Sequence, residues 1–573
     1  ELELGQSRIS IPRVEATYRT TEKGIDLDAM NLYASIASSK LSPVDMAFLD
    51  RRLGRYGGAV YFSGDIEGGK RWIKIRKLNL RASKPFLSMR LDGQIVNPFG
   101  NMKWNIRVAS LHVGRNTCEL FARDWKIPIP KEIIRLGDVH FAGYSAGDKE
   151  SVSLGGTLKS DLGRAKFNLK SGKTIQLAFS TQGFNVGGVF NNSRLGMLTA
   201  RLNVRLARNL SSVWARGTVT SFDFNGYSYK NIAVDGDYSN DTFNGMASIN
   251  DAGGTLSVRG RIENIQGFIE KRRDIIATVK IDAKSFNPER LNVTKAVSDK
   301  SFSFSASIEG RGSSLDNIVG SLSLENFSMT GKNEQFAMNS LKLKIDNSML
   351  RKMLNVRTDF GEVNLNGQYD YTTLERSVVR IARTYFPMLF KDPWKMPILS
   401  KYNTFYIYAK LEKSDWLKPL LGLNLDLPSA LSLNGKIDER TNSFNIYIDA
   451  PRVVYSEQTF TNTNITMLGI AGDMLVQAST QRMDAVNRPL SLKLNGKVHN
   501  GTIDSKIDFV TPGKTPMHGN IDSRATLFRS QNILGVHMHF NPSEISIDTI
   551  RLNLQPSEFT YVKGTLDIDH FEV

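Results

Sequence analysis

The chain has 573 residues, which is enough for several conventional domains or for one elongated repeat array. Lysine and arginine outnumber aspartate and glutamate by 74 to 57, and the formal charge of +17 favours anionic surfaces. This charge is spread along the chain without a Lys/Arg-dense helix, an aromatic stacking signature or zinc spacing, which argues against a nucleic-acid partner.

The single cysteine, Cys118, excludes an intrachain disulfide and a multi-thiolate metal site. The longest apolar runs fall short of the roughly 20 residues that a membrane-spanning helix needs. The sequence starts at Glu1 without a signal sequence and stops within a strand-like pattern at 569–573. We therefore expect an internal piece of a longer protein, with any membrane anchor outside this chain.

The first predicted helix begins near Ser42. Serine is a good N-cap, Pro43 suits the first turn, and Asp45 complements the positive end of the helix dipole. These signals predict a helix from there to about Gly54.

Two fragments resemble catalytic motifs. Residues 143–147 match G-x-S-x-G, but a nucleophile elbow needs a helix after the serine, and 151–155 alternates like a strand. Residues 171–174 resemble the end of a phosphate-binding loop, but the first glycine of that motif would fall at Phe167, and a strand-like run follows. Both fragments are predicted to be turns. We expect no enzymatic activity and no cofactor.

The dominant pattern is alternation of apolar and polar residues with period 2. Successive side chains of a strand point to opposite faces, so each such segment has one apolar and one polar face. Short turns rich in Gly, Asn and Asp separate the segments, as expected for hairpins. Clear examples of the alternation lie at 301–308, 341–345, 444–448, 490–494 and 536–540.

At roughly 10 to 12 residues per strand and turn, the chain would hold about 50 antiparallel strands. A flat sheet of that width would expose a very large apolar face, and a closed barrel would need an implausible circumference. We therefore predict a mainly β fold: an elongated, coiled antiparallel sheet that forms an open groove (a β-taco), with a few short helices. At about 4.8 Å per strand, the groove would be on the order of 200 Å long.

The predicted organisation is one continuous repetitive groove over residues 1–573. Sub-segments are expected at 1–140, 141–371 and 387–573, with a helical insertion at 372–386 between the last two.

The helix expected at 372–386 starts at a candidate capping box of Thr372 and Glu375. Its apolar residues recur at helical spacing, and its other side carries Arg376, Arg380 and Arg383. Two interpretations follow. A basic amphipathic helix can lie on a lipid surface. We favour the alternative, in which the helix plugs or edges the sheet with its arginines in water.

The seven histidines are scattered, and only His537 and His539 form a close pair on one face of a predicted strand. Residues two apart on a strand can bind a metal together. Because no Cys, Asp or Glu near them in the sequence completes the set, we predict no metal site.

The apolar strand faces carry the functional argument. They form either the closed core of one or more β-sandwiches or the lining of an open trough, and alternation alone does not distinguish the two. The absence of clear linkers and of a Trp-centred domain rhythm favours the trough. The residues we expect to line it and to contact lipid are Phe302, Phe304, Leu322, Leu324, Leu341, Leu343, Ile446 and Ile448.

A series of segments follows in a fixed order along the chain: 129–134 with 139–141, Tyr-Ser-Tyr-Lys-Asn-Ile-Ala-Val-Asp-Gly at 227–236, Phe-Asn-Gly at 243–245 with Asp251, the run 361–369 leading into Tyr-Phe-Pro at 385–387, and the block 518–564. Taken in order, these segments resemble the TamB family in the form found in Bacteroidota, the first of them more loosely than the others. TamB is the inner-membrane-anchored component of the translocation and assembly module, within the AsmA-like group. The resemblance covers most of the chain, although each motif has low specificity.

The resemblance implies a periplasmic groove that carries phospholipid or another apolar cargo between inner and outer membranes. It also implies support of outer-membrane biogenesis and protein translocation and assembly, an anchor in the inner membrane outside this chain, and an outer-membrane barrel-assembly partner. A structural or adhesive β-solenoid of the cell surface, with a filled core, is the alternative. A β-rich carbohydrate-active enzyme would need paired carboxylates in a cleft, and no constellation of residues indicates them.

Overall fold

The computed structural model describes the whole chain except residues 23, 127, 210, 315, 333–334, 348–349, 391–401, 415–416, 418–424, 456, 484–487, 512, 514, 531–532, 571 and 573. Strands account for 67% of the structure and helices for 9%, so the fold is mainly β, as predicted. The described strands belong to one antiparallel sheet that is not closed on itself, and the helices are few and short.

The chain packs as two compact units. The first comprises Glu1–Arg261 and Ala283–Asp299, and the second Ile262–Asp282 and Lys300–Val573. The sub-segments that the sequence suggested, with boundaries at 140 and 371, divide the chain differently and stay a prediction.

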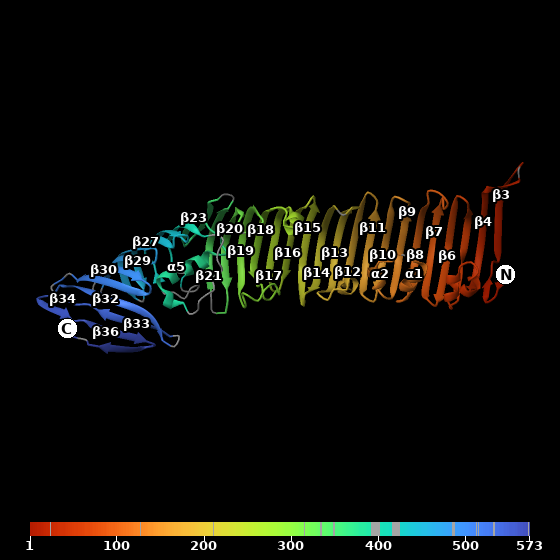
Figure 1. Cartoon of the computed structure of the whole chain (residues 1–573). Coiled ribbons are helices and arrows are strands. Elements are labelled where there is room, and N and C mark those ends of the chain that lie inside the picture. Colours follow the sequence, from red (N-terminus) through yellow and green to blue (C-terminus); the bar gives the residue numbers. More distant parts are fainter. Residues whose placement is uncertain are drawn as a thin grey trace. The chain divides into compact units, whose positions relative to one another are not determined.

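In the first unit, consecutive strands from β4 to β16 pair in a meander, each with the strands before and after it in the sequence (Figure 1). Its elements are β1 (Leu2–Leu4), β2 (Ser7–Ile9), β3 (Arg13–Thr21), β4 (Gly24–Leu41), the 3₁₀ turns η1 (Pro43–Met46) and η2 (Arg51–Arg55), β5 (Val60–Gly69), β6 (Trp72–Ser83), β7 (Phe86–Val96), β8 (Lys103–Val113), α1 (Thr117–Trp125), α2 (Lys131–Ile134), β9 (Val139–Gly147), β10 (Val152–Ser160), β11 (Gly163–Ser171), β12 (Thr174–Asn185), α3 (Val186–Phe190), β13 (Leu195–Ala207), β14 (Ser212–Phe224), β15 (Tyr227–Ser239), β16 (Thr242–Asp251) and most of β17 (Gly254–Glu263).

The second unit is also built mainly of antiparallel strands, and it contains helix α5. Its elements are α4 (Ile265–Ile269), most of β18 (Ile275–Phe286), β19 (Ser301–Gly312), β20 (Val319–Thr330), β21 (Gln335–Asp346), β22 (Lys352–Thr358), β23 (Gly361–Gln368), α5 (Leu374–Tyr385), η3 (Pro387–Leu389), β24 (Thr404–Leu411), β25 (Leu425–Asp426), β26 (Leu431–Asp438), β27 (Ser443–Tyr455), β28 (Gln458–Ile470), β29 (Asp473–Met483), β30 (Pro489–His499), β31 (Thr502–Thr511), β32 (Met517–Ser530), β33 (Ile533–Phe540), β34 (Ser543–Ile547), β35 (Ile550–Leu554), β36 (Ser557–Val562) and β37 (Thr565–Asp569).

The described part of the chain has 37 strands, fewer than the sequence pattern predicted. Individual strands are longer than we assumed: β4 has 18 residues and β32 has 14. Each strand therefore takes up more of the chain.

The helix predicted from Ser42 to Gly54 is wrong, because two separate 3₁₀ turns, η1 and η2, occupy this segment. Ser42 makes no side-chain capping bond, and the Asp50 carboxylate instead accepts a hydrogen bond from Arg52 N and starts a second turn. Phe48 and Leu49 are 73% and 70% exposed, so these residues form no packed apolar face that would support a longer helix.

The two motif-like fragments have different outcomes. Residues 143–147 are not a turn but lie inside β9, and the turn follows, where Asp148 Oδ1 accepts hydrogen bonds from the backbone N–H groups of Glu150 and Ser151, both at 2.9 Å. The close packing in this strand explains the glycine: a Cβ at Gly143 would lie 2.1 Å from Gly155 O and 2.7 Å from Phe141 Cζ. The turn predicted at 171–174 is confirmed between β11 and β12.

Helix α5 lies within the predicted range 372–386. Its N-cap is Thr373, which makes no side-chain capping bond, and the side chain of Glu375 lies outside the described ones. Among the helices that the structure describes, none is both long enough and apolar enough to cross a lipid bilayer.

Candidate functional site

In the second unit, apolar side chains oppose one another from strand to strand on one face of the sheet. Leu322 stands between Ile308 and Leu343, and directly opposed residues of antiparallel strands point to the same face. Every residue of this row is apolar and partly exposed. The row runs through Ile308, Leu322, Leu343, Val356, Val363, Ala409, Leu433, Ile448, Ile465, Ala478, Leu494, Ile507 and Ile521.

The structure places the eight residues predicted to line the groove on this same face. Three of them belong to the row, and the other five lie on its strands at even spacing, so their side chains share the face. All eight are partly buried. Their contact with lipid stays a prediction. In the row are Leu322, Leu343 and Ile448, and beside it are Phe302, Phe304, Leu324, Leu341 and Ile446.

A chain of aromatic rings extends from the predicted residues. The ring of Phe327 lies 6.1 Å from that of Phe302 and 6.4 Å from that of Phe304, and Phe336 links Phe327 to Phe360. Sequence reasoning missed Phe327 because a β-bulge at Asn326, where φ is 52°, shifts the alternation of β20 by one residue. The odd spacing between Leu324 and Phe327 was the available signal.

Helix α5 covers another part of the apolar face. Ile381 and Tyr385 of the helix pack with Phe444, Met474 and Val498 of the sheet, and the predicted lining residue Ile446 packs against this cluster. The packing of α5 therefore agrees with the favoured interpretation, in which the helix plugs or edges the sheet. The same interpretation placed the arginines of α5 in water. Arg376 is exposed, but Arg380 pairs with Glu439.

Glu439 is a fully buried carboxylate beneath α5, and sequence reasoning did not identify it. Its Oε2 accepts hydrogen bonds from the Ser377 hydroxyl at 2.8 Å and from Asn403 N at 2.9 Å. Arg380 Nη1 lies 3.2 Å from its Oε1. A buried carboxylate is stable only with such partners, so this network fixes the position of α5 on the sheet.

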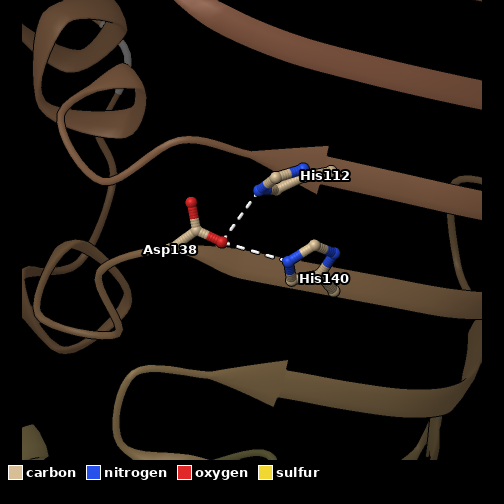
Figure 2. Close-up of side chains that lie close together, drawn as sticks. All are labelled: His112, Asp138 and His140. Carbon is tan, nitrogen blue, oxygen red and sulfur yellow. Dashed lines mark hydrogen bonds and ion pairs between the residues drawn. The ribbon is translucent and has the colours of Figure 1, made fainter.

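In the first unit, His112, Asp138 and His140 lie together on β8 and at the start of β9 (Figure 2). His112 Nε2 lies 2.8 Å and His140 Nε2 3.1 Å from Asp138 Oδ1, and the two imidazole rings stack with centroids 3.8 Å apart. Sequence reasoning missed this cluster because 27 intervening residues, including α1 and α2, hide the pairing of the two histidines.

The histidine pair that the sequence did identify, on β33, has a carboxylate partner after all. His539 Nδ1 lies 3.3 Å from one oxygen of Glu558, and His537 Nε2 lies 3.9 Å from the other. Glu558 comes from β36, which pairs directly with β33, and a single sequence does not reveal that register.

No family model matches the chain, and no curated protein matches it.

Proposed function

We propose that the apolar face of the second unit holds lipid acyl chains, and that this non-enzymatic chain carries phospholipid between the two membranes of a bacterial envelope. The observation that carries the proposal is the row from Ile308 to Ile521, in which every opposed residue is apolar and partly exposed. Soluble proteins rarely expose contiguous apolar patches larger than a few hundred Å². A linear apolar row matches the shape of an extended acyl chain.

Contact of acyl chains with this face would contribute favourably to binding. Burial of hydrocarbon contributes about 0.8 kcal/mol per CH₂ group, so covering half of a chain of about 16 carbons would give about 6 kcal/mol. The formal charge of +17, spread along the chain, favours anionic headgroups.

Because α5 already covers the sheet around Ile446, we place the acyl chains on β19–β21. Phe302, Phe304, Leu341 and Leu343 lie there on the apolar face.

The wider setting in this proposal rests on the resemblance to TamB. It comprises the periplasm, an inner-membrane anchor outside this chain, and support of outer-membrane protein assembly through a barrel-assembly partner. The alternative, a structural or adhesive β-solenoid with a filled core, is favoured by one observation, the packed cluster beneath α5.

Site-specific photo-crosslinking tests the proposal. A photoreactive residue at Phe304 or Leu343 should capture phospholipid in cells, whereas one at Ser303 or Lys342, the neighbouring positions on the opposite face, should not. Capture at Ser303 and Lys342 alone would show that the proposed face is wrong.

Lipid extraction and mass spectrometry of the purified chain separate the two functions. We expect bound phospholipid in the wild type, loss of it in Phe304→Glu, and retention in Lys342→Glu. A lipid-free wild-type chain whose apolar face is filled by its own side chains would favour the structural solenoid.

A further inference from the structure

We propose that His112, Asp138 and His140 form a binding site for a transition-metal ion of the zinc type. Each residue offers one ligand atom, and the three atoms lie within 4.8 Å of one another. Figure 2 shows both imidazole rings directed at the same carboxylate.

The strand register produces this arrangement. His112 on β8 is directly opposed to His140 on β9, so their side chains leave the sheet on the same face. Asp138 precedes His140 by two residues and therefore shares that face. Leu111 and Phe141, the neighbouring opposed pair, occupy the other face, so the three ligands lie on the polar side of the sheet.

The distances suit tetrahedral coordination. Zinc binds histidine nitrogen and carboxylate oxygen at about 2.0–2.2 Å, which separates ligand atoms by roughly 3.3 Å. The present separations from Asp138 Oδ1 are 2.8 Å to His112 Nε2 and 3.1 Å to His140 Nε2. Shifts of a few tenths of an ångström would bring these two separations to the tetrahedral value, and the two histidine nitrogens lie within 4.8 Å of each other.

The chemistry of the ligands selects the class of metal. Two imidazole nitrogens and one carboxylate oxygen suit Zn²⁺, Co²⁺, Ni²⁺ or Cu²⁺, whereas Ca²⁺ and Mg²⁺ prefer sets of oxygen ligands. The His112 and His140 side chains are 28% and 49% exposed, which leaves solvent access for a fourth ligand.

Neighbouring residues hold two of the ligands in place. The Phe86 ring packs edge-on against His112 with centroids 4.6 Å apart, and the backbone N–H of Asp138 donates a hydrogen bond to Asp161 Oδ2 at 2.9 Å. Such support reduces the conformational entropy lost when a metal binds.

A bound ion would join the two ends of an insertion. His112 stands at the end of β8 and Asp138 immediately before β9, and residues 114–137 between the two strands contain α1 and α2. The metal would therefore fix the base of this insertion. This role is independent of lipid on the apolar face.

Metal titration of the purified, chelator-treated chain tests the site. Isothermal titration with ZnCl₂ and the visible spectrum with CoCl₂ should show one equivalent that is lost in His112→Gln and in His140→Gln. In Asp138→Asn we expect binding at least tenfold weaker. Zinc should raise Tm in the wild type and leave Tm unchanged in His112→Gln.

The matched control is His499→Gln. His499 contacts a single carboxylate, Asp473, at 2.8 Å, like His112, but it lacks the second histidine, so this variant should keep the equivalent. Circular dichroism checks that each variant is folded. Absence of zinc binding by the wild type, or equal binding by all folded variants, would overturn the assignment.

Discussion

Arg380 Nη1 lies 3.2 Å from Glu439 Oε1 in a polar cluster buried between helix α5 and the sheet. The Glu439 side chain is fully buried and that of Arg380 is 26% exposed. Glu439 lies in the turn between β26 and β27, so the ion pair attaches the helix to this turn, in addition to the apolar contacts of Ile381 and Tyr385.

Removing this carboxylate should loosen α5. In Glu439→Ala, Asn403 N loses its acceptor, the Ser377 hydroxyl keeps only Thr373 O, and Arg380 loses its carboxylate partner, so we expect a loss of about 3 kcal/mol in the free energy of unfolding. Urea denaturation measures it, and limited proteolysis should cut α5 sooner than in the wild type. Arg376→Ala, at an exposed position on the same helix, should change stability by about 0.5 kcal/mol or less. Equal effects of the two variants would refute the anchoring role.

The close fit of α5 also predicts a strict requirement for glycine at residue 469. A Cβ there would overlap the Phe444 ring and the Tyr385 hydroxyl, which belong to the cluster beneath α5. Gly469→Ala should therefore cost about 1–3 kcal/mol through overpacking.

Gly496 provides the matched comparison for Gly469. It also lies within a strand on the apolar face, but the nearest atom to an added Cβ would be 3.7 Å away, an ordinary contact. Gly496→Ala should leave the urea midpoint nearly unchanged. If Gly469→Ala were equally silent, the packing described for Tyr385 would be incorrect.

Because of Tyr227, we expect the folded protein to lose stability in alkaline solution. Burial raises the pKa of its hydroxyl to about 12, and the hydrogen bond that it donates to Asp251 acts in the same direction. In the unfolded chain, tyrosine titrates near pH 10, so the folded state holds this proton more tightly. The stabilising contribution is therefore complete below about pH 10 and is lost as the pH rises to about 12.

Urea denaturation between pH 9 and pH 12 measures this effect. The free energy of unfolding of the wild type, relative to that of Tyr227→Phe, should be constant up to about pH 10. It should fall between about pH 10 and 12. A difference that is the same at all these pH values would show that Tyr227 is not the group responsible.

The local part of the fold was predictable, and the long-range part was not. Alternation and turn residues identified strands such as 301–308, because each strand face follows from its own residues. Register is a property of two strands, so the meeting of His112 with His140 across the α1–α2 insertion could not be deduced. The bulge at Asn326 places Phe327 on the apolar face against the period of the strand, and only the odd spacing between Leu324 and Phe327 indicated it in the sequence.

The covered and uncovered parts of the apolar face should differ in what they contact. Ile446 packs against the cluster that contains Ile381 and Tyr385, so a photoreactive residue at this position should link to α5 within the protein. One at Leu343, on the same face of the sheet but outside that cluster, should link to phospholipid under the proposed function.

In Glu439→Ala, the loosened helix should shift part of the capture at Ile446 from protein to lipid. Mass spectrometry of the crosslinked products distinguishes the two, and lipid capture at Ile446 in the wild type, with none on α5, would contradict the packing of the helix. Crosslinks to protein at Ile446, without lipid capture at Leu343, would instead support the packing of α5 and refute the acyl-chain proposal. The two claims are tested independently because each is measured at its own residue.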